Sequence, residues 1–194
     1  MGPMTQAVVA ALAATGFAAG GARAQPYTLD PEHTYPHWSV KHLGLTTFHG
    51  KFTKSSGKAF LDRANRTGRV EVTIDPASSI SGHETLDRQM RGAAFFQVDK
   101  FPAVTFKSTA FRFDGDRLAA VEGELTMLGQ TKPVTLTVNS YRCTTHFHLK
   151  IEVCGVEART VLRRLEWGIG TRFPPPILAD EVEMYIQAEG FRDQ

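Results

Sequence analysis

Residues 37 to 52 read HWSVKHLGLTTFHGKF, a stretch that contains two runs of alternating side chains. Successive side chains of an extended chain point to opposite sides of a sheet, so this alternation predicts two strands, each with one covered face. The covered faces hold Trp38, Val40 and His42 in the first run and Phe48, Gly50 and Phe52 in the second. Because a sandwich core seldom contains an imidazole, this surface is expected to meet another sheet, a bound molecule or a metal ion.

The same alternation recurs along the rest of the chain and predicts eight strands. Several runs are regular, with apolar residues on one face and polar residues on the other, which is typical of antiparallel sheets. Clusters of Gly, Pro, Asn and Asp separate the runs and indicate turns. The strands are expected near residues 27–43, 47–62, 68–75, 104–113, 118–127, 132–141, 146–163 and 181–191.

A single helix is predicted at SGHETLDRQMRG, residues 81–92, where Leu86 and Met90 lie one turn apart. A helix of this length cannot cover eight strands, so the sheet must fold into a sandwich or close into a barrel. Strands of ten residues or more favour an elongated barrel, whose interior is filled by side chains or holds one small ligand. The predicted fold class is therefore all-β with one short helix.

The N-terminal region has the pattern of a secretory signal peptide. The apolar segment Val8–Ala19 is too short to span a bilayer and is followed by the small-residue triplet Ala22, Arg23, Ala24. We expect cleavage after Ala24, so that residues 1–24 are the signal peptide and residues 25–194 form one exported domain. A buried N-terminal helix is the alternative, and three glycines within the segment disfavour it.

The charge balance argues against nucleic acid as a partner. The sequence has 22 Lys and Arg against 20 Asp and Glu, and loss of Arg23 with the signal peptide leaves 21 against 20. Nucleic-acid-binding proteins usually carry a clustered basic stripe, which this chain lacks. The short VLRRLEW segment is interpreted as a solvated strand end that exposes Arg163 and Arg164.

Two cysteines, Cys143 and Cys154, flank the segment TTHFHLKIEV. In an oxidising compartment such a pair more often forms a disulfide, which is the prediction here. The alternative is a zinc site that adds His146 and His148 from one strand face, although structural zinc sites generally use tighter spacing. No nucleophile elbow, zinc-protease helix or phosphate loop is present. We therefore expect no catalytic residue, no metal and no cofactor.

Four further segments are informative in their order and spacing: YTLDPEHTYPHWSVKHLGLTTFHGKF (27–52), FFQVDKFPAVTFKST (95–109), GELTMLGQTKPVTLTV (123–138) and EVCGVEARTVLRRLEWGIG (152–170). Together they resemble the YceI-like family of bacterial periplasmic polyisoprenoid-binding proteins, and the resemblance covers essentially the whole chain after the predicted signal peptide. It implies a periplasmic, lipocalin-like, extended eight-stranded antiparallel barrel with a helix at one end and a long apolar pocket for an isoprenoid chain.

The family's motifs fall on individual residues of this chain. The first-strand motif and the motif after the helix match at Asp30, Pro31, His33, Val40, His42, Phe95, Phe96, Lys100, Pro102 and Phe106. Two motifs depart from the family. Leu128 stands before Gly129 where the family usually has histidine, and Trp167 stands where a late R-x-D-F-G motif has phenylalanine. These departures bear on headgroup preference and on ligand length.

The leading functional prediction is a non-catalytic carrier of a polyisoprenoid or another long-chain amphiphile, including quinones. The alternative is an enzyme that acts on an apolar substrate in the same barrel with His42 as base, and a third reading is an interaction module for a membrane redox partner. A homodimer and a structural role for His42 both stay open. The predicted ligand-binding residues are Trp38, Val40, His42, Phe48, Phe52, Val72, Phe106, Leu125, Leu136, Leu162, Trp167, Val182 and Ile186.

Overall fold

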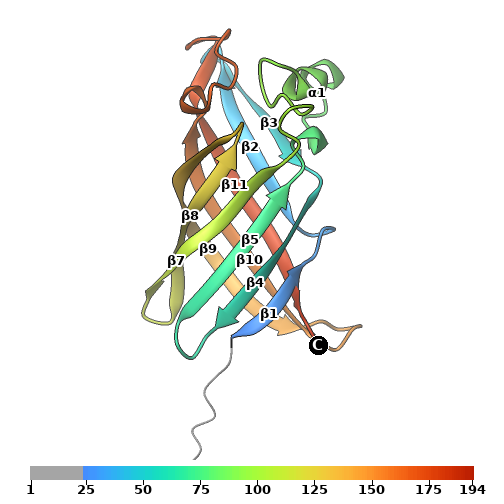
Figure 1. The fold of residues 1–194 in the computed structure, drawn as a ribbon, viewed down its shortest axis with the longest axis vertical. Coiled ribbons are helices and arrows are strands. Elements are labelled where there is room, and N and C mark those ends of the chain that lie inside the picture. Colours follow the sequence, from blue (N-terminus) through green and yellow to red (C-terminus); the bar gives the residue numbers. More distant parts are fainter. Residues whose placement is uncertain (1–23) are drawn as a thin grey trace, which may run out of the picture.

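The computed structural model describes residues 24–194, so the predicted signal peptide lies outside the described residues except for Ala24. The described chain consists mainly of long antiparallel strands, with α1 (Glu84–Arg91) at one end (Figure 1). Short 3-10 turns, η1 (Pro76–Ser78) and η2 (Arg164–Trp167), precede β6 and follow β10. The strands are β1 (Gln25–Leu29), β2 (Tyr35–His42), β3 (Thr46–Phe52), β4 (Ser55–Asp62), β5 (Thr67–Ile74), β6 (Ser79–Ile80), β7 (Val104–Asp114), β8 (Arg117–Met127), β9 (Gln130–Thr145), β10 (Glu152–Arg163) and β11 (Leu178–Arg192).

Eight strands close into a barrel in the order β1, β4, β5, β7, β8, β9, β10, β11 and back to β1. Closure leaves β1 bonded on both edges, since Leu29 pairs with Gly190 of β11 while Thr28 pairs with Lys58 of β4. Nearer the α1 end, β11 pairs with β2, and β2 pairs with β3. The strand pairs β1/β2 and β3/β4 thus act as two long, interrupted barrel strands. The prediction of an all-β, eight-stranded antiparallel barrel is confirmed.

The first predicted strand, 27–43, is interrupted at residues 30–34, so the prediction of one continuous strand was wrong. Pro31 has no backbone N–H to donate, and the Asp30 carboxylate accepts the Glu32 N–H at 2.9 Å and contacts His33 Nδ1 at 2.6 Å. The hydrogen bond to Asp30 raises the pKa of His33. Thr34 is fully buried, and its hydroxyl donates to the Glu189 carbonyl at 3.2 Å, which keeps the interrupted edge attached to β11.

The predicted strand over 146–163 begins later, because residues 146–151 form the turn between β9 and β10. The Lys150 N–H donates to the His146 carbonyl at 2.9 Å, and Lys150 has a φ of 57°. His146 and His148 therefore do not share a strand face. Cys143 and Cys154 lie directly opposite each other on β9 and β10 and are joined by a disulfide. The predicted disulfide is present. Because both cysteines form this bond, neither offers the thiolate that the zinc alternative needed.

Reduction of the disulfide is expected to lower the free energy of unfolding by about 3 kcal/mol, because the bond closes a loop of about a dozen residues in the unfolded chain. Urea unfolding with and without a thiol reductant measures the difference. The double variant Cys143→Ser/Cys154→Ser is the control, since its unfolding midpoint should match that of the reduced wild type and ignore the reductant. Equal midpoints for the oxidised and reduced wild type would contradict the estimate.

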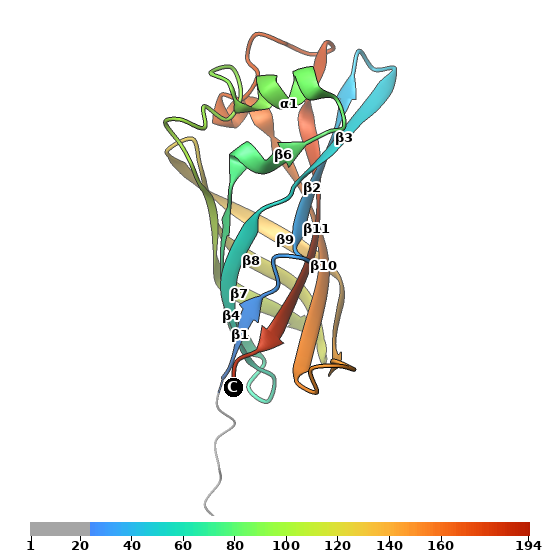
Figure 2. The same ribbon diagram turned by 90° about the vertical axis from the view of Figure 1, so that its right-hand side faces the viewer.

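The helix α1 is shorter than predicted and lies across one end of the barrel (Figure 2). His83 caps it, because its Nδ1 accepts the Leu86 N–H at 3.3 Å. Met90 is buried and Leu86 packs against the same core, so the predicted apolar face of the helix is the face that points inward. Within residues 24–194, no helix is long and apolar enough to cross a membrane.

Two aromatic side chains occupy space that glycines on neighbouring strands leave open. The indole of Trp38 lies over Gly50, its partner across β2 and β3, where an added Cβ would sit 2.2 Å from Trp38 Cζ2. The ring of Phe106 on β7 lies over Gly123 of β8 in the same way, at 2.5 Å from such a Cβ. Glycine at these positions lets bulky rings lie flat against the barrel wall.

Candidate functional site

A cavity of about 270 Å³ occupies the half of the barrel beside α1, which contributes Leu86, Gln89 and Met90 to its wall. Its wall is made by side chains from β2, β3, β5, β7, β8, β9, β10 and β11, by α1, and by the segments that follow α1 and η2. Of 32 lining residues, 27 are apolar or aromatic. The five polar ones are Thr34, His42, Gln89, Thr160 and Arg164. Such a wall suits an apolar molecule with few polar groups.

All thirteen residues that the sequence predicted for ligand binding line this cavity. Twelve of them reach the inner wall through the alternation of strands β2, β3, β5, β7, β8, β9, β10 and β11. The thirteenth, Trp167, comes from η2. Val134, Leu136 and Ile186 are only half-buried although they face inward, because they border open space rather than packed side chains. Contact between the thirteen predicted residues and a ligand stays a prediction.

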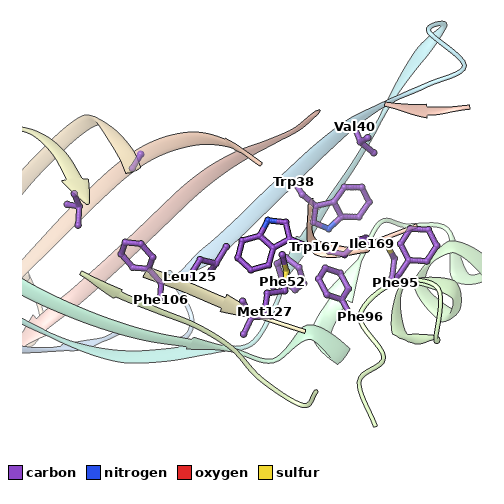
Figure 3. Packing of buried hydrophobic residues seen from close by; sticks show 14 of the residues in the cluster. Trp38, Val40, Phe52, Phe95, Phe96, Phe106, Leu125, Met127, Trp167 and Ile169 are labelled. Carbon is purple, nitrogen blue, oxygen red and sulfur yellow. The ribbon is translucent and has the colours of Figure 1, made fainter. Parts of the chain in front are cut away.

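An aromatic collar surrounds the cavity near α1, and Figure 3 shows its members pointing inward from several elements. The rings of Phe52 and Phe96 meet edge to face at 5.5 Å, and the Trp38 indole N–H donates to Ser79 Oγ at 3.2 Å. The collar therefore presents ring faces and edges without a buried, unpaired indole N–H. Its members are Trp38, Phe52, Phe95, Phe96 and Trp167.

The middle of the barrel, directly beyond the cavity, is packed with side chains. Val121, Val138 and Ala158 are buried there and are absent from the cavity wall. They lie further along β8, β9 and β10 from the α1 end, beyond the cavity residues Leu125, Leu136 and Leu162 in the strand register. The cavity thus reaches the surface at the exposed residues Phe48 and Ile177 and is closed by side chains on the side of the C-terminus. Figure 1 shows α1 and the C-terminus at opposite ends of the barrel.

The interpretation of Arg164 as part of a solvated strand end is wrong. Its side chain is 3% exposed and donates five hydrogen bonds to backbone carbonyls. These bonds, of 2.6 to 2.8 Å, go to Ile169, Gly170, Phe173, Leu178 and Ala179. Burial lowers the pKa of the guanidinium, and the nearby charge of Asp180 opposes this shift. Arg163, in contrast, is exposed and pairs with Glu181 at 3.6 Å.

Arg164 organises the segment between η2 and β11 that forms one side of the cavity mouth. The carbonyls that it binds belong to residues 169–179, and this segment supplies Ile169, Phe173, Ile177 and Leu178 to the cavity wall. Sequence reasoning missed these four residues because no alternation runs through the segment. The family motif that falls on Arg164 was the available signal, but it gave the residue no role.

Among residues 24–194, the polar wall side chains without a hydrogen bond are His42 and Gln89, near the mouth, and Thr160 on β10. The ring of His42 stacks on Phe48 at 4.6 Å with an interplanar angle of 16°. Within residues 24–194, no carboxylate or amide hydrogen-bonds to the His42 ring. Gln89 extends from α1 into the same wall. Arg164 has no donor left, and the Thr34 hydroxyl is already bonded to Glu189.

A smaller pocket of about 220 Å³ lies at the opposite end and has a different character. Of its charged residues, Arg63 pairs with Glu152, Arg66 pairs with Asp116, and Asp62 accepts hydrogen bonds from Asn65. Tyr27 also donates to Glu152, and burial is the largest cause that raises the pKa of Tyr27 to about 12. These interactions give the charged groups around this pocket partners within the protein.

Relatives with known sequences match almost the whole chain. A UPF0312 protein of Pseudomonas aeruginosa is 32% identical over 195 residues, which covers 94% of this chain and 95% of that protein. A UPF0312 protein of Yersinia pestis is also 32% identical, over 192 residues, and covers 92% of this chain and 93% of that protein.

Solved structures share the fold at lower sequence identity. The Burkholderia cenocepacia protein BcnA has a TM-score of 0.70 and 24% identity, covering 83% of this chain and 98% of that one. A polyisoprenoid binding domain from Saccharophagus degradans has a TM-score of 0.63 and 13% identity, covering 86% of this chain and 98% of that one. The model of the YceI-like domain matches residues 27–190, which is nearly the whole barrel. The chain therefore belongs to the YceI-like domain family.

Proposed function

We propose that the protein is a non-catalytic lipid-binding protein that carries a polyisoprenoid or another long-chain amphiphile in the barrel cavity. The observation that carries this proposal is the cavity wall, in which 27 of 32 residues are apolar or aromatic and which reaches the surface at Phe48 and Ile177. The fold shared with a domain described as polyisoprenoid binding supports the same ligand class. A quinone with an isoprenoid tail has the same chemistry and belongs to this class.

Burial of the lipid chain supplies enough free energy for tight capture. At about 25 cal/mol per Å², removing roughly 400 Å² of apolar ligand surface from water gives a gross gain near 10 kcal/mol, before the cost of ordering the ligand. The chain would occupy the space between Phe106, Leu136 and Ile186. The polar headgroup would stay at the mouth, where His42 and Gln89 are the free polar groups of the wall.

The environment of His42 favours binding over catalysis. A general base is usually oriented by a hydrogen bond from a third group, and among residues 24–194 no side chain provides one for the His42 ring. Stacking on Phe48 gives the ring an apolar neighbour instead. The disulfide and the predicted signal peptide support a periplasmic location.

Native mass spectrometry of protein purified from the periplasm, before and after extraction with organic solvent, tests the proposal. We expect a complex with one long-chain amphiphile before extraction and the mass of the residue 25–194 chain afterwards. The extracted protein should recover a bound ligand when it is incubated with geranylgeraniol. A folded protein that carries no lipid and takes up none would contradict the carrier function.

A further inference from the structure

Exposed apolar side chains surround the mouth of the cavity on two neighbouring segments. Leu43 and Leu45, at the tip of the β2–β3 hairpin, are 48% and 79% exposed. Phe48 and Ile177 line the mouth and are also exposed. The Leu43 N–H donates to the Ile177 carbonyl at 3.0 Å, so the two segments form one surface. We call residues 41–49 and 171–177 the mouth rim, and Figure 2 shows both segments at the end of the barrel that carries α1.

The backbone conformation of the hairpin tip does not favour leucine. Leu43 and Gly44 have φ values of 54° and 69°, and the Leu45 N–H donates to the His42 carbonyl at 3.0 Å. A two-residue turn with positive φ at both central positions favours Asn or Asp followed by Gly, and a leucine there costs free energy. Leu128 adopts the same kind of conformation before Gly129, but its side chain packs against the core.

The mouth rim also carries only positive charge. Residues 41–49 and 171–177 include Lys41 and Arg172, both exposed, together with His42 and His49, and they contain no Asp or Glu. Exposed leucines beside cations are the features of a surface that binds anionic headgroups and places apolar side chains at the acyl boundary. A stable protein dimer usually buries about 800 Å² on each partner, which is more than these few side chains offer.

We propose that the mouth rim docks on the surface of an anionic lipid bilayer, with Leu43 and Leu45 inserted at the boundary between headgroups and acyl chains. This inference rests on the proposed lipid-binding function and specifies how the ligand is exchanged. With the rim on the bilayer, the cavity mouth faces the acyl layer, and a lipid chain passes between membrane and barrel without crossing water. Lys41 and Arg172 hold the rim against the anionic headgroups.

Flotation with vesicles of phosphatidylglycerol and phosphatidylethanolamine tests the docking. We expect wild-type protein to float with the vesicles and the variant Leu43→Asn/Leu45→Ser to float about tenfold less. Asparagine suits the positive φ at position 43, so the thermal midpoint of this variant should equal or exceed that of the wild type. The matched control is Phe147→Ser/Leu149→Ser, which removes two exposed apolar side chains at the opposite end of the barrel and should float like the wild type.

Ligand capture measured without vesicles separates docking from lipid binding. With geranylgeraniol delivered from cyclodextrin, the Leu43→Asn/Leu45→Ser variant should bind as the wild type does, whereas Leu136→Glu should lose the ligand but still float. A wild type that captures geranylgeraniol but does not float overturns the docking alone. A wild type that floats but captures nothing overturns the proposed function alone. Equal loss of flotation in the control, or a rim variant that changes only the oligomeric mass, also overturns the docking.

Discussion

Replacement of Arg164 by methionine is expected to lower the free energy of unfolding by about 3 to 5 kcal/mol. The side chain is buried and donates to five backbone carbonyls, three in the segment between η2 and β11 and two at the start of β11. Methionine fills a similar volume but donates no hydrogen bond, so all five carbonyls lose a partner. Urea unfolding monitored by circular dichroism measures the loss.

The neighbouring residue is the matched control. Arg163 is exposed, and its ion pair with Glu181 spans 3.6 Å, so Arg163→Met should cost no more than about 1 kcal/mol. Arg164→Lys keeps the charge but cannot reach five acceptors in fixed directions, and its stability should fall between those of the wild type and Arg164→Met. Similar effects at positions 163 and 164 would show that the hydrogen bonds of Arg164 do not hold the segment in place.

A carboxylate in the cavity is expected to abolish lipid retention. Leu136→Glu places a charge beside the bound chain, where it has neither water nor a partner, and retention of geranylgeraniol should fall to less than about one tenth of the wild-type level. Mass spectrometry of the complex measures the bound fraction. The control is Thr135→Glu on the outer face of β9, where the charge stays in water and binding should be unchanged.

The stability of the same variant distinguishes an open cavity from a packed core. In a cavity that opens to solvent, the ligand-free Leu136→Glu barrel should remain folded, because water can enter around the carboxylate. In a core without space, the same substitution should destabilise the fold by several kcal/mol whether or not lipid is present. Unfolding of the ligand-free variant at the wild-type midpoint is therefore the expected result, and a large shift would contradict the cavity.

Local alternation was sufficient to predict the barrel strands and the side chains that face inward. Val72 and Leu136 could be placed because each has a polar neighbour on either side along its strand. The interruption at residues 30–34 could not be predicted in this way, since the hydroxyl of Thr34 bonds to Glu189, 155 residues further along the chain. The turn at residues 146–151 was missed because its histidines and apolar residues continue the alternation of a strand.

One part of the site that alternation could not reveal lies outside the regular strands. The segment after η2 has no repeating pattern, and its path depends on hydrogen bonds from Arg164, a residue type that usually lies at the surface. The burial of Arg164 could not be predicted from the sequence, because its partners are backbone carbonyls whose positions depend on the folded structure. The disulfide, in contrast, was predictable because compartment and cysteine count point to the same pairing.

The side chains packed beyond the cavity close it on the side of the C-terminus. In the proposed carrier, a chain that enters tail first from the mouth leaves headgroup first along the same path, so loading and release compete for the same opening. The distance from the mouth to Val121, Val138 and Ala158 would then limit the length of tail that the cavity accepts. A shorter tail would leave space unfilled, and a longer tail would keep its first units and its headgroup outside the wall. The proposed binding mode therefore selects ligands by the length of their apolar chain.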